Sequence, residues 1–219
     1  VTLSTFKLYY LFHVPFFMLQ KRFLDLIGNY SKNDSFKLEC WEEITQHYNA
    51  KNRHYHNLHH LGNMFRELEK VKQDVREMDS LLFSIFYHDI IYKATKSDNE
   101  YQSALLFKKR ISQTQFKKIE YCFQQIEATK AHELSEDADT NLLIDIDLAI
   151  LGQQWKVYEI YCQQIRQEYR VYPNIMYRKG RKKVLEKMLA HEQIYKTPHF
   201  IKQYESSARE NIAKELEAL

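Results

Sequence analysis

Apolar residues recur every three or four positions along almost the whole of this chain of 219 residues. Leu61, Phe65 and Leu68 illustrate the spacing, which puts side chains on one face of an α-helix. No stretch alternates apolar and polar residues for long enough to predict a sheet. Glycine and proline, on which the turns of β-rich folds depend, occur only four and three times. The sequence therefore predicts an all-α protein.

Short polar segments divide the chain into about eight predicted helices. These segments are residues 30–35, 49–54, 93–99, 132–141, 152–154, 173–177 and 196–199. None of them is a long linker rich in Pro, Gly or Ser, and the chain has no internal repeat of fixed period. We therefore expect one compact helical bundle, a single domain that spans residues 18–216.

Residues 1–17 are expected to be an N-terminal extension to this predicted domain, with a weak membrane-surface helix as an alternative, and the sequence leaves open whether they belong to the functional chain. The apolar run at residues 3–19 is interrupted by Lys7, His13 and Pro15, which makes it too short and too polar to span a bilayer. No signal-peptide cleavage pattern of small residues follows it. The three cysteines are scattered and form no CxxC pair, which is typical of a reducing compartment. We expect a cytoplasmic protein without a membrane span.

The chain carries 32 basic and 29 acidic residues, a near-balance that argues against a dedicated nucleic-acid-binding protein. One basic run, RKGRKKVLEK at residues 178–187, stands out from this balance. We interpret it as a solvated helix face, because the chain lacks the wider basic surface that nucleic-acid binding needs. The sequence leaves the oligomeric state open.

Histidines are concentrated in one part of the chain. Six of the ten lie between positions 47 and 88, and four of these are in RHYHNLHHL at residues 53–61. His56 and His60 are four residues apart, so a helix through both would offer two imidazoles to one metal ion. No glutamate follows His56, which excludes the HExxH motif of zinc proteases.

Two apolar segments contain ionisable residues that a buried helix seldom carries without compensation. His88 and Asp89 end the run LLFSIFYHDII, and Asp145 and Asp147 lie within LLIDIDLAILG. Metal coordination would compensate such groups. Taken singly, each histidine has the alternative of a hydrogen-bonded core residue, and Asp145 that of a cap on the helix through residue 149. Taken together they predict a metal site, with Asp145 and Asp147 as alternative ligands.

The order His60…His88-Asp89…Asp147 resembles the signature of the HD superfamily of metal-dependent phosphohydrolases, which are all-α domains. Further segments resemble a small bacterial branch of predicted phosphohydrolases in that superfamily. These segments are RHYHNLHHL, FYHDIIY, SDNEYQSA, IEATKAHE, LLIDIDLAILG, IRQEY and the tail at residues 180–216. The resemblance covers residues 18–216 and implies an HD-domain bundle with metal-dependent phosphohydrolase activity.

The resemblance also implies a role for each motif residue. The implied metal ligands are His60, His88, Asp89 and Asp147. The segment YHNLHH is similar to the YHNxxH segment of cyclic-nucleotide phosphodiesterases, which implies that His56 donates a proton to the leaving group while His60 binds metal. The segment DLA at residues 147–149 is similar to the metal-binding Asp-Leu-Ser of those enzymes, which favours Asp147 over Asp145. The likeness is local and does not imply cyclic nucleotides as substrates.

A set of imidazoles and carboxylates suits one or two ions of Mn, Fe, Co, Ni or Zn, and Mg less well. Such an ion can lower the pKa of its water to about 7 and polarise a phosphoryl oxygen. Asp89 could bridge to a second ion and so take part in catalysis. Arg53, Lys130 and His132 are candidates for phosphate contacts, and Glu100 for a hydrogen bond to a ligand or to a metal water. The expected substrate is a small-molecule phosphate ester, with nucleotides as one candidate class.

Two alternatives stay open on the same fold. One is a di-iron oxygenase, in which His132 or Glu100 would complete a ligand set richer in histidine. The other is a non-catalytic nucleotide-binding module stabilised by its metal. Substrate identity depends on pocket walls that the sequence does not describe.

Overall fold

The computed structural model of the protein describes residues 16–219, and this part of the chain is all-helical, as expected. Its helices are α2 (Phe16–Gly28), α3 (Asp34–Tyr48), α4 (Leu58–Val71), α5 (Met78–Tyr87), α6 (Asn99–Ile111), α7 (Ile119–Ala128), α8 (Ala138–Leu148), α9 (Trp155–Glu168), α10 (Asn174–Ala190) and α11 (Pro198–Ala218). Two short 3₁₀ helices, η1 (Lys72–Asp74) and η2 (Ala149–Gly152), follow α4 and α8. Most of the predicted extension at residues 1–17 lies outside the described residues. Within residues 16–219, no helix is long and apolar enough to cross a membrane.

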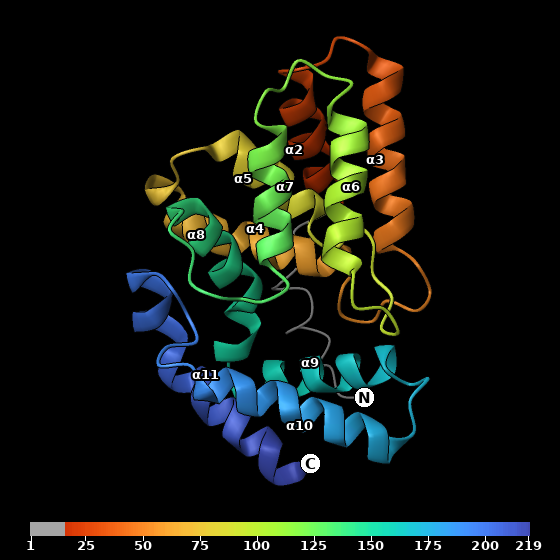
Figure 1. Cartoon of the computed structure of the whole chain (residues 1–219). Helices are drawn as coiled ribbons and strands as arrows, with labels where there is room; N and C mark the ends of the chain where they lie inside the picture. Colours follow the sequence, from red (N-terminus) through yellow and green to blue (C-terminus); the bar gives the residue numbers. More distant parts are fainter. Residues whose placement is uncertain (1–15) are drawn as a thin grey trace.

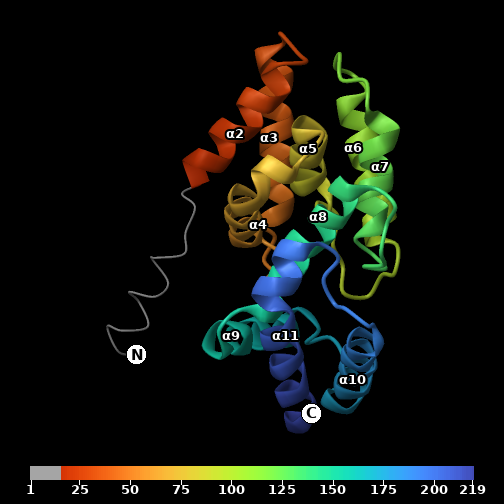
Figure 2. The ribbon, with the colours of Figure 1, turned by 90° about the vertical axis from the view of Figure 1, so that its left-hand side faces the viewer.

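The helices form two groups that share one core (Figures 1 and 2). Helices α2, α3, α6 and α7 stand together at one end, and α9, α10 and α11 lie together at the other. Helices α4 and α8 lie between the groups, while α5 packs against α7 and α8. The core of buried apolar side chains is continuous through both groups. The segments that carry the predicted metal ligands, α4, the end of α5 and α8, therefore belong to the middle of the molecule.

The expectation of about eight helices is too low, because it misses two breaks, one between α4 and α5 and one between α6 and α7. At the first, after η1, the buried carboxylate of Asp139 accepts hydrogen bonds from the backbone N–H groups of Arg76 and Glu77 at 3.0 and 2.7 Å. At the second, between α6 and α7, the N–H of Gln115 donates to the carbonyl of Tyr30 at 2.8 Å. Both breaks are stabilised by partners far away in the sequence, so local composition does not reveal them.

Two glycines give a matched test of this packing. A Cβ on Gly152 would lie 2.4 Å from Cβ and 2.8 Å from the carbonyl oxygen of Tyr204, because η2 meets the backbone of α11 there. A Cβ on Gly180, within α10, would meet nothing within 4 Å. We expect Gly152→Ala to lower the free energy of unfolding by about 1–3 kcal/mol through overpacking. Gly180→Ala should raise it by about 0.5–1 kcal/mol through helix propensity.

Urea unfolding followed by circular dichroism measures both changes of stability. Because both variants carry the same substitution, any difference between them reflects the surroundings of the two glycines. The urea midpoint should fall for Gly152→Ala and rise for Gly180→Ala. A Gly152→Ala protein as stable as the wild type would contradict the close approach of η2 to α11.

Candidate metal centre

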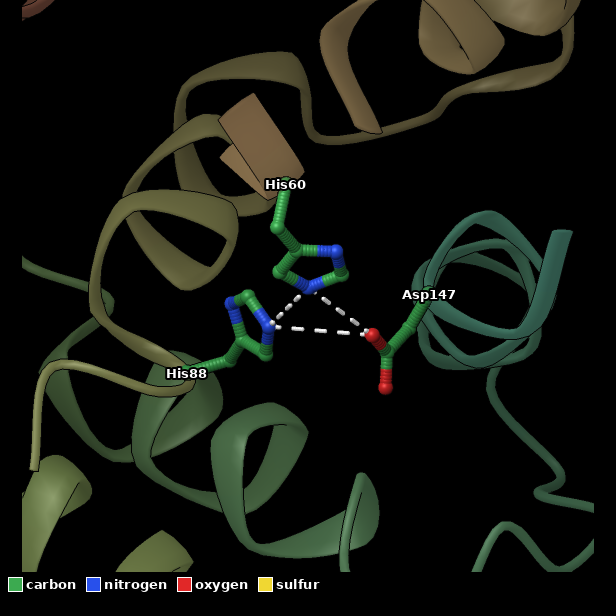
Figure 3. Close-up of side chains that lie close together, drawn as sticks. All are labelled: His60, His88 and Asp147. Atoms are coloured by element: carbon green, nitrogen blue, oxygen red, sulfur yellow. Dashed lines mark hydrogen bonds and ion pairs between the residues drawn. The ribbon is translucent and has the colours of Figure 1, made fainter. Parts of the chain in front are cut away.

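Three side chains from separate helices converge at one point (Figure 3). His60 lies in the first turn of α4, His88 directly follows α5, and Asp147 is near the end of α8. Nε2 of His60 is 3.1 Å from Nε2 of His88 and 3.1 Å from Oδ1 of Asp147, and Nε2 of His88 is 3.8 Å from the same oxygen. The two imidazoles are almost fully buried, at 2% and 1% exposure. All three groups thus direct a possible ligand atom toward one point.

The helix boundaries fix the positions of these donors. Asn57 is the N-cap of α4, where its side chain accepts from the N–H of His59 at 2.8 Å. His56 therefore precedes the helix, and the expectation that His56 and His60 share one helix face is wrong. His88 is the C-cap of α5. The carbonyl end of a helix favours positive charge, so this end of α5 favours a cation at the His88 ring.

The orientation of His88 is set by its second ring nitrogen. Nδ1 lies 2.8 Å from the carbonyl oxygen of Ile85 and donates to it, which leaves the lone pair of the neutral ring on Nε2. Metal-binding histidines are commonly held in this way. Donor atoms that share one transition-metal ion at about 2.0–2.2 Å lie about 3–3.5 Å apart. Two of the three donor separations, both 3.1 Å, fall in this range, and the third, 3.8 Å, lies just beyond it, so the donor set can accommodate a divalent ion.

Asp89 extends the cluster toward His56. Its Oδ2 lies 3.2 Å from Nε2 of His88, 4.0 Å from Nε2 of His60 and 3.9 Å from Nε2 of His56. Burial raises the pKa of the Asp89 carboxyl, but the His88 and His56 imidazoles outweigh it and hold that pKa below its usual value. Burial likewise lowers the pKa of His88, while the Asp89 carboxylate raises it, to about 9. The Asp89 carboxylate and the His88 imidazole thus stabilise each other's charged forms.

The two aspartates of α8 point to different places. Asp145 is fully buried, and its carboxylate accepts from the backbone N–H groups of Lys196 and Thr197 and from the Thr197 hydroxyl, each at 2.7 Å. Burial raises the pKa of Asp145 to about 6, although these hydrogen bonds oppose the shift. Asp145 thus anchors the start of α11, and Asp147 reaches the candidate metal centre. The expectation that Asp145 caps its own helix is wrong, since Asp137 is the N-cap of α8.

Sequence reasoning missed the partner of His56, which is Glu168 at the end of α9. One carboxylate oxygen, Oε1, accepts from the backbone N–H groups of residues 54, 55 and 56 at 2.8, 2.8 and 3.0 Å. The other, Oε2, lies 2.6 Å from Nδ1 of His56. Burial raises the pKa of Glu168, but His56 and the N–H donors lower it, to about 2. Burial lowers the pKa of His56, whereas Glu168 and Asp89 together raise it above its usual value.

The sequence did contain a signal for Glu168. It lies three residues after Ile165 and seven after Tyr161, so it falls on the apolar face of α9. A carboxylate on such a face requires a partner. Tyr92, also missed, stacks its ring on that of His56 at a centroid distance of 4.1 Å and an interplanar angle of 27°. Together Glu168 and Tyr92 hold the ring of His56 with Nε2 on the side of Asp89.

His132 also reaches the candidate metal centre, through an uncommon backbone conformation. Its φ is 52°, in the left-handed region that non-glycine residues seldom adopt. Its Nε2 lies 3.3 Å from Oδ2 of Asp147, the carboxylate oxygen that does not face His60. Glu100 is half-buried near the same place: burial raises its pKa, Asp89 adds to the shift, and Lys130 and His132 oppose it. Lys130 is exposed.

Arg53 is held in a position that does not suit the expected phosphate contact. The residue is buried, and its guanidinium donates to the carbonyl oxygens of His56, Asp89 and Ile90 at 3.1, 2.6 and 2.7 Å. These bonds tie the segment before α4 to the segment after α5. Arg53 therefore positions the two segments that carry the histidines.

Comparison of the chain with protein-family models, with curated proteins and with solved structures gives no match. The interpretation of this site therefore depends on its own geometry and on the motifs in the sequence. The geometry brings together His56, His60, His88, Asp89, Asp147 and His132.

Proposed function

We propose that this protein is a metal-dependent phosphohydrolase with an HD-type helical bundle, acting on a small phosphate ester. The observation that carries the proposal is the convergence of His60 Nε2, His88 Nε2 and Asp147 Oδ1 within 3.1–3.8 Å, beside a histidine fixed by a buried glutamate. The ordered HD-like motifs support the same assignment.

His60, His88 and Asp147 would hold the ion, and Asp89 would supply a fourth ligand or bridge to a second ion. A bound divalent ion supplies Lewis-acid polarisation of a phosphoryl oxygen and makes water more acidic. The donor set of imidazoles and carboxylates favours Mn, Fe, Co, Ni or Zn over Mg. The metal requirement is therefore the first property to test.

His56 would protonate the leaving oxygen of the ester. Glu168 accepts from Nδ1 and so places the transferable proton on Nε2, which faces Asp89. The carboxylate stabilises the charged imidazole before transfer, and the stacked ring of Tyr92 restricts its rotation. A positioned acid of this kind contributes about 10²–10⁴-fold to a rate. The His56–Glu168 pair thus supports an acid-assisted hydrolysis.

The proposal predicts metal-dependent release of phosphate. Protein stripped with a chelator should be inactive toward aryl phosphates, alkyl phosphates and nucleotides, and at least one of Mn²⁺, Fe²⁺, Co²⁺, Ni²⁺ or Zn²⁺ should restore turnover. Phosphate release over this panel is the measurement. Turnover that survives complete metal removal would contradict the proposal.

Metal affinity should fall as the solution becomes more acidic. The pKa of His88 is raised to about 9, mainly by Asp89 against the effect of burial, so below that pH an incoming ion must displace a proton. For each proton displaced, the affinity falls about tenfold per pH unit. Titration calorimetry at pH 6, 7 and 8, in buffers of different ionisation enthalpy, should show proton release. An affinity independent of pH would contradict this account of the site.

His132 favours one second candidate, a di-iron oxygenase on the same fold, because its imidazole already contacts Asp147. In that case iron-loaded protein should consume O₂ with a reduced organic substrate, and manganese should not support activity. Hydrolysis with manganese and no O₂ uptake would favour the phosphohydrolase.

A further inference from the structure

Helix α10 lies at the outer edge of the group formed by α9, α10 and α11 (Figures 1 and 2). Of its 17 residues only Tyr177 and Leu185 are buried. The basic run noted in the sequence, residues 178–187, lies within this helix. Most of α10 is therefore exposed to solvent.

Two parallel rows of side chains follow the exposed side of α10, each with four-residue spacing. We call them together the α10 face. One row is Ile175, Lys179, Lys183 and Lys187, and the other is Met176, Gly180 and Val184. The exposed fractions of the apolar members are high: 83% for Ile175, 59% for Met176 and 47% for Val184. An apolar row thus lies beside a row of lysines, and both face solvent.

The lysines of the α10 face have no acidic partner. Among the described residues, no carboxylate oxygen lies within 4.0 Å of the ammonium groups of Lys179, Lys183 or Lys187. The neighbouring Lys182, by contrast, pairs with Glu186 at 3.8 Å. Val171, in the connection that precedes the helix, is also exposed, at 63%. The α10 face combines uncompensated positive charge with aliphatic side chains that nothing covers within the described chain.

We propose that the α10 face binds an anionic lipid surface. Lysines can reach lipid phosphates while their stems, together with Ile175, Met176 and Val184, enter the boundary of the acyl chains. The face lies along a helix at the outer edge of the molecule (Figure 2). The only aromatic residue of α10, Tyr177, is buried, so the helix offers no ring for stacking on nucleic-acid bases. Charge and exposed aliphatic groups together therefore favour lipid over nucleic acid.

The test is flotation of the full chain with phosphatidylcholine vesicles that contain about 30% phosphatidylserine, compared with pure phosphatidylcholine vesicles. Because residues 1–17 include most of a second, interrupted apolar run, the decisive comparison is between variants. Lys179→Glu/Lys183→Glu reverses two unpaired charges on the α10 face. Lys109→Glu/Lys117→Glu reverses two exposed lysines at the α6–α7 end, far from α10 (Figure 1).

We expect the wild type and the Lys109/Lys117 control to bind anionic vesicles equally well, and Lys179→Glu/Lys183→Glu to bind at least about tenfold more weakly. Met176→Ser/Val184→Ser should weaken binding with no change of charge. Circular dichroism shows whether each variant keeps its helix content. Absence of vesicle binding by the wild type, or equal binding by all variants, would overturn the proposal. Binding of a single-stranded oligonucleotide in place of vesicles would also overturn it.

Discussion

Replacing Asp147 with asparagine should remove the metal ion and all measurable hydrolysis, whereas the same replacement at Asp145 should leave metal binding intact. Oδ1 of Asp147 faces Nε2 of His60 at 3.1 Å, and a neutral amide is a poor ligand there. Loss of an outer hydrogen-bond partner already weakens metal sites by about 10–100-fold, and loss of a direct ligand should exceed that range. We therefore expect metal affinity to fall by more than about 100-fold in Asp147→Asn.

Asp145→Asn is the matched control because it lies on the same helix, two residues away. Its carboxylate holds the backbone N–H groups of Lys196 and Thr197, so the amide should cost about 1–3 kcal/mol of stability by leaving a buried group unpaired. Calorimetric metal titration and urea unfolding of both variants measure the two properties. Metal binding by Asp147→Asn as tight as in the wild type would contradict the assignment.

Removing the imidazole of His56 should preserve metal binding but lower turnover by about 10²–10⁴-fold. The loss should be largest for alkyl phosphates, since an alkoxide leaving group needs the proton that Nε2 supplies. Aryl esters with acidic phenols should lose much less. Parallel assays of His56→Ala on an alkyl and a nitrophenyl phosphate give this comparison, and equal losses on both esters would contradict the role of His56 as the acid.

Glu168→Gln tests how His56 is held. The amide oxygen can still accept from the backbone N–H groups of residues 54–56, but the negative charge beside Nδ1 is lost. Since the Glu168 carboxylate raises the pKa of His56 against the effect of burial, the variant should have a lower His56 pKa. The acid must be protonated to act, so the alkaline limb of the pH–rate profile should move to lower pH. An unmoved limb with a uniformly reduced rate would indicate a structural role only.

The all-α class could be predicted from the sequence because the spacing of apolar residues within each helix indicates it. The spacing of Leu61, Phe65 and Leu68 is enough to indicate a helix, and that helix is present as α4. The break before α5 could not be predicted in the same way, since Asp139, more than sixty positions away, supplies the hydrogen bonds that stabilise it. The start of α4 had a local signal in Asn57, a residue favoured at N-caps, which the four-residue spacing of His56 and His60 obscured.

The candidate site could likewise be predicted only in part. His88 and Asp147 could be predicted as site residues because ionisable groups in apolar segments need a partner that compensates their charge. The pairing of His56 with Glu168 joins residues 112 positions apart, and only the packing of α9 against the segment before α4 reveals it. The different roles of Asp145 and Asp147 likewise depend on the residues packed against α8. Lys196 and Thr197 bind the carboxylate of Asp145, whereas His60 faces that of Asp147. A sequence indicates which groups need partners, while the fold determines which partners they receive.

Elemental analysis of the purified wild type and of His88→Ala tests the central claim most directly. Nε2 of His88 belongs to the three-donor cluster, and the ring is fixed by its bond to Ile85. The wild type should contain one or two divalent transition-metal ions per chain, and His88→Ala should contain none while keeping its helix content. Absence of metal from the wild type, even after reconstitution with the ions named above, would contradict the account. In that case the converging histidines and aspartate would not form a metal centre.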